Sequence, residues 1–373
     1  MPKLDRYLLG EILVPFAASF VGLMGFWVFG DLIERLDSFE SASAGPEIIA
    51  AYYFQRTPEF LILLTPIAFL FALLFTMTRL CRANELVAMR AAGMSLQRIM
   101  TPYLGLALAL AALIAGAQEF LAPQAQRNLE LMRSAIDGDE DPSEVAAPAV
   151  DIYHQSEGRV WNIDAFHRNE ERMRGVDVQW TTSDGRSIRI IADSATWDGR
   201  QWVFEQGREF LTANADSQSP VRRSFEQRPT PELTSPPEYF EGWLRLAKLD
   251  DPRQIKEIAL SLRQIAQLES TLDVGPSEKR TQLRARRHAN LTTPLSPVVI
   301  AILGAPFAAY SHRRDLFVGV ANTLLLGIFY LYCHRLLLPL GASGRLPPIL
   351  AAWIPHAAFI TFGTALIARA RFR

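Results

Sequence analysis

Few residues of this 373-residue chain stand at a spacing that supports covalent chemistry. The sequence has no Gly-x-x-x-x-Gly-Lys-Ser/Thr loop for nucleotide phosphates, no His-Glu-x-x-His pair and no Gly-x-Ser-x-Gly elbow. Asp31, Glu34, Asp37 and Glu40 recur at helical spacing, which is more typical of a solvated helix end than of a paired-carboxylate site. The sequence therefore predicts no catalytic residue, no metal site and no cofactor in this chain. We interpret the six scattered histidines as surface or interfacial side chains: His154, His167, His288, His312, His334 and His356.

The most informative polar segment runs from residue 82 to residue 95. Its composition favours a short helix, with Asn84 as a candidate cap at the start and Gly93 as the stop. Leu86 and Met89 form a small apolar face between charged neighbours, and such a helix can dock a partner in a groove. An inert connector between two longer helices is the alternative. The candidate docking residues are Glu85, Leu86, Met89, Arg90 and Gly93.

Two apolar blocks, at about residues 12–118 and 291–368, flank a long polar interval, and the segment 82–95 lies within the first block. A helix that crosses a bilayer needs about 20 predominantly apolar residues. Each block has room for three such helices. Six buried helices of a soluble protein are a poor alternative, because several of the segments have almost no polar face. The predicted spans are residues 12–33, 60–80, 102–117, 291–309, 316–336 and 349–368.

The distribution of Lys and Arg predicts the orientation of these spans, because short cytoplasmic loops are rich in both residues. The connection 79–98 carries four arginines against the single carboxylate of Glu85. We therefore expect both termini in the cytoplasm and the polar interval on the opposite side. Arg284, Arg286 and Arg287 oppose this topology, but the rule is weak beside a long translocated domain. The basic residues that support it are Lys3, Arg6, Arg79, Arg82, Arg90, Arg98, Arg313, Arg314, Arg369, Arg371 and Arg373.

The polar interval has the pattern of a β domain between about residues 149 and 235. Short stretches of alternating polarity recur every ten residues or so, at 160–163, 176–180, 187–192 and 201–204. Turn signals separate them at Ser183-Asp184-Gly185, Trp197-Asp198-Gly199 and Gln206-Gly207. This spacing predicts an antiparallel sandwich or jelly roll. An amphipathic helix is expected at about 252–272, with Asp251 as its N-cap and Pro252 at its first position.

Several segments together resemble the LptF/LptG permease family, the membrane subunits of the lipopolysaccharide exporter. The run from Glu85 to Ser95 resembles the family signature, and the similarity extends over nearly the whole chain. The N-terminal segment leans slightly towards the LptG kind. The other matching segments are Leu4-Asp5-Arg6-Tyr7, Thr57-Pro58-Glu59 with Pro66, Ala192-Asp193-Ser194-Ala195-Thr196-Trp197 with Gly199 and Trp202, and Arg286-Arg287 through Pro294 to Leu303-Gly304-Ala305-Pro306.

The resemblance implies a half-transporter rather than an enzyme. Two such permeases would enclose a cavity open to the outer leaflet of the inner membrane, above an LptB-like ATPase dimer that grips the 85–93 helix. Lipopolysaccharide would enter the cavity and leave through the β domain towards an LptC-like periplasmic protein. Nucleic acid is not an expected partner. A membrane-anchored periplasmic scaffold, or a permease of a different lipid or lipoprotein ABC transporter, remains an alternative.

The resemblance also directs attention to candidate contacts with the substrate. Arginines just outside the first and third spans could bind head-group phosphates, although the carboxylates near residue 31 depart from the basic character of the family there. Apolar residues of the β domain could carry acyl chains or simply form its core. The head-group candidates are Arg35, Arg127 and Arg133, and the acyl-chain candidates are Trp161, Ile163, Val178, Trp180, Ile190 and Trp202.

The expected fold is thus a membrane α-helical protein with six spans in a 3+3 arrangement and an inserted periplasmic antiparallel β-jellyroll. Residues 1–121 would hold spans one to three, with the coupling helix at about 83–94. Residues 122–290 would form the periplasmic region, with the β-jellyroll at about 149–235. Residues 291–373 would hold spans four to six and a cytoplasmic tail.

Overall fold

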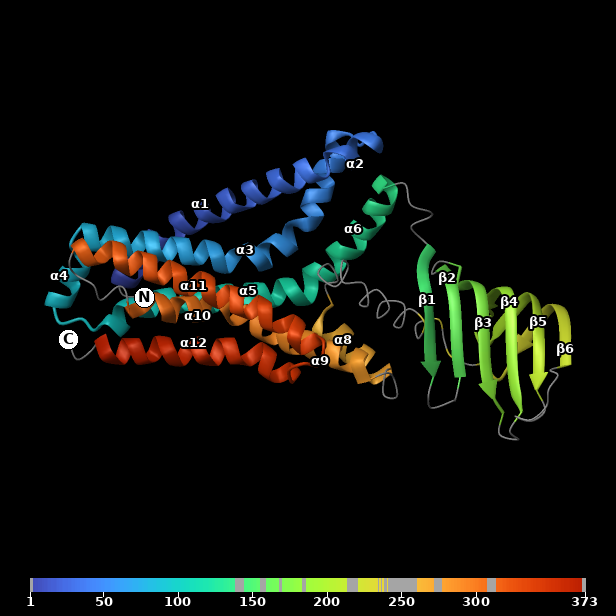
Figure 1. Cartoon of the computed structure of the whole chain (residues 1–373). Helices are drawn as coiled ribbons and strands as arrows, with labels where there is room; N and C mark the ends of the chain where they lie inside the picture. Colours follow the sequence, from blue (N-terminus) through green and yellow to red (C-terminus); the bar gives the residue numbers. More distant parts are fainter. Residues whose placement is uncertain are drawn as a thin grey trace. The chain divides into compact units, whose positions relative to one another are not determined.

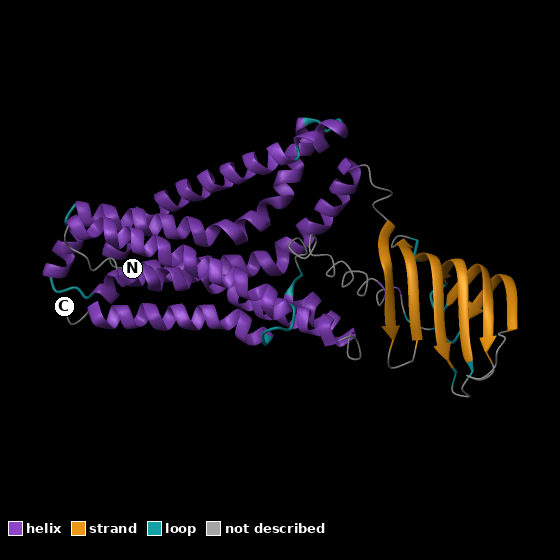
Figure 2. Cartoon of the chain, viewed as in Figure 1, coloured by secondary structure: helices purple, strands orange, loops and turns teal. Residues whose placement is uncertain are grey.

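The computed structural model describes residues 3–137, 144–154, 159–167, 170–182, 186–212, 221–233, 235, 237, 240, 260–271, 277–306 and 313–370. The chain forms two compact units. The first unit comprises Met1–Leu129, Ala259–Ile265 and Thr281–Arg373, and it is helical. The second comprises Glu130–Ile258 and Ala266–Arg280, and it contains a β-sheet (Figure 2).

Both ends of the chain contribute helices to the first unit (Figure 1). A π-helical turn, η1 at Ala117–Leu121, follows α5, and a 3-10 turn, η2 at Thr293–Leu295, precedes α10. The α-helices of the chain are α1 (Lys3–Glu34), α2 (Leu36–Ser41), α3 (Pro46–Arg82), α4 (Glu85–Ala91), α5 (Leu96–Gly116), α6 (Ala122–Asp137), α8 (Leu262–Thr271), α9 (Ser277–Thr292), α10 (Ser296–Gly304), α11 (Arg313–Ala342) and α12 (Pro348–Ala370).

Five helical segments in the described part of the chain are long and apolar enough to cross a membrane: Lys3–Glu34, Pro46–Arg82, Leu96–Gln126, Gly319–Ala342 and Pro348–Ala368. The region predicted as the fourth span is interrupted instead. Pro294 lies in η2 and Pro297 in the first turn of α10, and proline lacks the N–H that a continuous helix needs. α10 has nine described residues, and 307–312 lie outside the described part. The structure supports several spans without establishing six.

The apolar core of the helical unit forms mainly around α3. Two thirds of the most apolar window of α3 is buried, against 6% for α1. Phe69 and Leu73 of α3 belong to one buried cluster with Tyr103 of α5 and Ile300 of α10. The outer helices expose large apolar side chains such as Val21, as expected of surfaces that face lipid. α3 is therefore the central helix, and α1 lies at the periphery.

The second unit contains one six-stranded antiparallel sheet. Each strand pairs with its sequence neighbour, in the order β1-β2-β3-β4-β5-β6. The antiparallel β domain is confirmed, whereas the jelly-roll arrangement stays a prediction, since the described strands form one sheet of consecutive neighbours. The strands are β1 (Glu144–His154), β2 (Arg159–His167), β3 (Arg172–Thr181), β4 (Ser187–Trp197), β5 (Trp202–Thr212) and β6 (Val221–Thr230).

Two residues with positive φ shift the side-chain alternation near the middle of the sheet. In β3, Val176 is buried and Arg174 is exposed, yet Met173 is buried again. Gly175 lies at this shift with a φ of 57°. In β5, Gln206 lies at a similar shift with a φ of 49°. Such local irregularities re-aim side chains. In β3 the shift keeps apolar residues buried on both sides of Gly175, whereas in β5 the buried residues change from Phe204 before Gln206 to Glu209 after it.

The predicted turn at Gln206-Gly207 is consequently wrong, since both residues lie inside β5. The Gln206-Gly207 pair marks a point of unusual backbone conformation, here a positive φ at Gln206. A bulge within a strand uses such a residue as readily as a turn does. The predicted turn at Asp198-Gly199 is confirmed between β4 and β5. The Asp198 Oδ1 atom accepts the N–H groups of Gln201 and Arg200, each at 2.8 Å, and these bonds lower the pKa of its carboxyl.

The expected amphipathic helix at 252–272 is described only in its second half. Helix α8 covers Leu262–Thr271, with Ile265 and Leu268 buried. The predicted cap at Asp251 and Pro252 lies outside the described residues.

Gly175→Ala should destabilise the sheet through both backbone strain and a steric clash. A Cβ at Gly175 would collide with the Asp164 side chain, whereas a Cβ at Gly199, where φ is 91°, meets open space. We expect a loss of about 1–3 kcal/mol for strain alone in Gly199→Ala and a larger loss for Gly175→Ala. Thermal unfolding of the purified full chain, followed by protease resistance of the sheet, measures both. Equal losses would show that Asp164 imposes no steric limit.

Candidate functional site

The segment between α3 and α5 folds as the predicted short helix. α4 spans Glu85–Ala91, preceded by Asn84 with a φ of 57°. The Gly93 N–H donates to the Arg90 carbonyl at 3.0 Å, and the Met94 N–H donates to the Met89 carbonyl at 3.2 Å. This pair of bonds is a Schellman ending, and the φ of 86° at Gly93 explains why glycine stands there. The helix and its stop at Gly93 are confirmed.

Leu86 and Met89 were predicted to form an apolar face for a partner. In the structure they point into the chain's own core. Leu86 is 2% exposed and Met89 9% exposed, within the cluster that holds α3 and α5. A helix of seven residues has room for one apolar stripe, and α4 uses it to pack on the bundle. The exposed residues of α4 are Val87, Ala88, Arg90 and Ala91.

Polar contacts connect this end of the bundle to the start of α1. The Tyr7 hydroxyl donates to Glu85 Oε2 at 2.7 Å. Arg98, at the start of α5, forms an ion pair with Asp5 at 2.7 Å. Tyr7 and Asp5 belong to the N-terminal sequence motif, but no role could be predicted for them, because their partners are distant in the chain.

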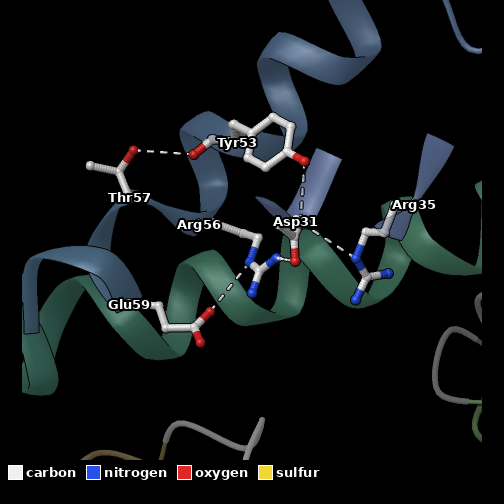
Figure 3. Close-up of polar contacts among 6 residues, drawn as sticks. All are labelled: Asp31, Arg35, Tyr53, Arg56, Thr57 and Glu59. Carbon is white, nitrogen blue, oxygen red and sulfur yellow. Dashed lines mark hydrogen bonds and ion pairs between the residues drawn. The ribbon is translucent and has the colours of Figure 1, made fainter. Parts of the chain in front are cut away.

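A second polar cluster joins the opposite end of α1 to α3 (Figure 3). The Arg56 guanidinium pairs with Asp31 at 2.5 Å, and the Tyr53 hydroxyl donates to the same carboxylate at 3.2 Å. Glu59 contacts Arg56 from one turn further along α3, at 3.4 Å. The Arg56 side chain is 9% exposed and lies 5.2 Å from the Phe60 ring centroid. Asp31 therefore serves as the counter-ion of a buried arginine.

Arg56 is not among the residues predicted from the sequence. The available signal was a lone arginine within a largely apolar helix together with a carboxylate at the exit of the preceding one. An ionisable residue near an apolar span is a functional candidate by default, and its partner is the first question. The carboxylates near residue 31 seemed to oppose head-group binding, but Asp31 has a structural partner of its own.

The predicted head-group residues are only partly described. Arg35 contacts Asp31 at 3.5 Å and lies 5.6 Å from the Tyr52 ring centroid, with 28% of its side chain exposed. Arg127 and Arg133 lie on α6, and their side chains are outside the described part of the structure. The structure thus brings Arg35 beside Arg56, while the contribution of the other two stays a prediction.

The predicted acyl-chain residues form one buried apolar surface of the sheet. Trp161, Val178 and Ile190 are direct cross-strand partners on β2, β3 and β4. Ile191, next along β4, is 39% exposed, because alternate residues of a strand face opposite sides. All six candidates are at most 4% exposed: Trp161, Ile163, Val178, Trp180, Ile190 and Trp202.

Part of this surface is covered by the segment that follows β6. The Phe240 ring lies 4.8 Å from Trp161 and 5.5 Å from Trp202, measured between ring centroids. The Trp202 indole N–H donates to the Ser235 carbonyl at 2.9 Å. These aromatic contacts stabilise the sheet as a core does. These residues therefore pack as a core, and carrying acyl chains would be a second role.

Comparison with known families decides the identity of the chain. It matches the family model for the lipopolysaccharide export system permease LptF/LptG over residues 6–369. The chain belongs to the LptF/LptG family. No curated protein sequence gave a match. Because the family model covers both subunit kinds, the lean towards LptG stays a prediction.

Membership and the apolar helices together make the chain a multi-pass inner-membrane protein with a permease role in lipopolysaccharide export. LptF/LptG proteins are transporter subunits that act within an Lpt complex. Family membership does not identify the residues that couple this chain to its partners.

Two of the histidines predicted as surface or interfacial side chains of this LptF/LptG protein are buried between helices. His334 of α11 is 5% exposed and His356 of α12 is 1% exposed, with ring centroids 4.9 Å apart. The Tyr330 hydroxyl lies 3.0 Å from His356 Nε2 and donates to Ser296 Oγ at 3.1 Å. This network joins α10, α11 and α12. Buried polar groups need such partners, and sequence spacing cannot reveal them across three helices.

Arg56→Gln should destabilise the helical unit by about 3–5 kcal/mol, because it leaves the Asp31 carboxylate without its closest counter-charge. Arg35→Gln is the matched control. Its contact with Asp31 is longer and more exposed, so the expected loss is about 0–1 kcal/mol. Thermal unfolding of the detergent-solubilised chain measures both variants. Similar losses in the two would contradict the assignment of Arg56 as the principal partner of Asp31.

Proposed function

We propose that this chain is one of two permease subunits of an ABC transporter that extracts lipopolysaccharide from the inner membrane. An LptB-like ATPase dimer supplies the energy, a second LptF/LptG-type permease completes the cavity, and an LptC-like protein receives the substrate. The observation that carries the proposal is helix α4. It is a short helix anchored between two spans in a chain that the family match assigns to lipopolysaccharide export.

The proposed orientation places α4 and both termini in the cytoplasm and the β-sheet in the periplasm. The support is the charge of the connection around α4, where four arginines face one glutamate. In this orientation α4 is accessible to a cytoplasmic ATPase.

The proposed docking surface is the outer side of α4, namely Val87, Ala88 and Arg90, together with Glu85 at its start. Leu86 and Met89 contribute by anchoring the helix to the bundle. A rigid anchor matters because an ATPase can move the spans only if the helix it contacts does not slide on them. Gly93 contributes by ending the helix sharply enough for α5 to begin.

The proposed substrate path ends on the apolar surface of the sheet. Lipopolysaccharide has long acyl chains, and a buried surface of tryptophan, valine and isoleucine side chains can shield them from water. The same substrate has a phosphorylated head, for which Arg35 and Arg56 provide planar cationic donors. The phosphate would then replace Asp31 as the partner of these two arginines. Arg35, the more exposed of the two, would be the first to bind the phosphate. Arg127 and Arg133 remain further candidates.

Two alternatives make different predictions. A membrane-anchored periplasmic scaffold would copurify with no ATPase and would give no lipid crosslinks on the sheet. A permease for another lipid or for lipoproteins would bind an ATPase but crosslink to a different substrate.

Val87→Asp should weaken copurification with the ATPase by about tenfold, because it places a charge on an apolar interface contact. Glu85→Ala should act in the same direction. Gln97→Ala, an exposed substitution in the first turn of α5, is the control and should copurify normally. If Val87→Asp and Glu85→Ala both retain the ATPase fully, the outer side of α4 is not the docking surface.

A photo-reactive residue at Ile190 should crosslink to lipopolysaccharide in cells, whereas the same residue at Ile191 should not. The two positions are adjacent on β4 but face opposite sides of the sheet, so they differ in little else. Gel mobility with an antibody to lipopolysaccharide reads out the adduct. Equal crosslinking at both positions, or none at either, would contradict a path along the buried surface.

A further inference from the structure

The N-terminal end of α1 is fixed to three other elements of the bundle by polar contacts. Asp5 pairs with Arg98 of α5, and Tyr7 donates to Glu85 of α4. Glu11 forms an ion pair with Arg79 at the end of α3. Asp5 and Glu11 are each only 15% exposed in their side chains. Charge-assisted bonds of this kind are among the stronger polar interactions of proteins.

Apolar packing lies directly beneath these contacts. Leu8 and Ile12 are completely buried, and they belong to the same cluster as Leu86 and Met89 of α4. Positions 5, 8 and 12 share one face of a helix, as do 7 and 11 on its flank. The first three turns of α1 therefore bond to α4 through Tyr7 and share its apolar cluster.

The rest of α1 is packed much more loosely. Leu8 and Ile12 are the only buried residues of Lys3–Glu34, all of which the structure describes. Beyond Ile12, α1 exposes Val14, Val21 and Phe26 at 68–76%. At its far end, the Asp31 contact with Arg56 is the next strong link to α3. A helix held firmly at one end and loosely along its length can follow a displacement of the end that is held.

We propose that Tyr7 and Asp5 form a clamp that makes α1 move with α4, so that they couple ATP hydrolysis in a partner to the movement of the first span. This inference rests on the proposed function. Tyr7 acts as a positioning residue, since it reaches the ATPase only through Glu85. A carboxylate accepts several hydrogen bonds, so Glu85 can keep Tyr7 while it also accepts a bond from a cation of the ATPase.

The clamp explains the N-terminal motif. In Leu4-Asp5-Arg6-Tyr7, the acid forms an ion pair with α5 and the tyrosine donates a hydrogen bond to α4. Because α1 is bonded separately to α4 and to α5, it would follow a displacement of both helices together and not the rotation of one of them.

The decisive variant is Tyr7→Phe, which removes the hydroxyl and keeps the ring. The full complex, with its ATPase and second permease, is reconstituted in vesicles that contain lipopolysaccharide. Copurification, ATP hydrolysis and lipopolysaccharide release are measured together. We expect normal copurification, ATP hydrolysis within about twofold of wild type, and a drop of about tenfold in lipopolysaccharide released per ATP, the factor for one hydrogen bond to a charged group.

Two further variants separate coupling from folding. Tyr332→Phe, at an exposed tyrosine of α11, is the matched control and should release lipopolysaccharide normally. Tyr7→Phe combined with Glu85→Ala should lower release per ATP no further than Glu85→Ala alone in the complexes that still assemble, because both changes remove the same bond. Asp5→Asn should also lower release per ATP, since it weakens the second contact of the clamp.

Unchanged release per ATP in Tyr7→Phe would overturn the clamp, and so would additive losses in the double variant. Loss of the ATPase in Tyr7→Phe would also overturn it, because the tyrosine would then be part of the docking surface. A wild-type complex that hydrolyses ATP without releasing lipopolysaccharide would contradict the proposed function instead.

Discussion

A lipid bilayer offers no hydrogen-bond partner to the backbone or to a charged side chain, and the helical unit is organised around that constraint. Its long helices satisfy their own backbone groups, and their ionisable residues gather near the helix ends. Where an ionisable group is buried, it has a partner from another helix, as Arg56 has Asp31. Such pairs fix which helix ends meet, because a buried charge without its partner is costly.

The two ends of α1 show how the same constraint can serve transport. One end is tied to α4 and α5 through Tyr7 and Asp5, and the other is tied to α3 through Asp31. Between them the helix presents apolar side chains to its surroundings. The proposed coupling path therefore starts at an end where contacts are dense and passes along a helix where they are sparse, which is the distribution that a moving element needs.

In the sheet, the organising requirement is a continuous apolar surface. Gly175 has a positive φ and shifts the alternation of β3 so that Met173 is buried together with Val176. This arrangement gives the sheet a core in which aromatic rings pack at 4.8–6.5 Å. The proposed acyl path uses the same surface, so stability and substrate binding would compete for the same side chains.

Local signals determined a large part of this protein from the sequence alone. Hydrophobic length identified five of the spans, and capping signals located α4 and its stop at Gly93. Alternation identified β2 to β5, and the acyl-chain candidates do share one surface. Each of these features depends on residues within about one or two turns of each other, or on every second residue of a strand.

Tertiary structure decided what depends on residues far apart in the chain. It turned Leu86 and Met89 inward, because the bundle offers α4 an apolar surface. It gave Asp31 to Arg56, Glu85 to Tyr7 and His356 to Tyr330, and it paired the strands as a meander. The sequence shows that such groups exist, but only packing decides which of them meet, since a contact between distant residues leaves no periodic pattern in the chain.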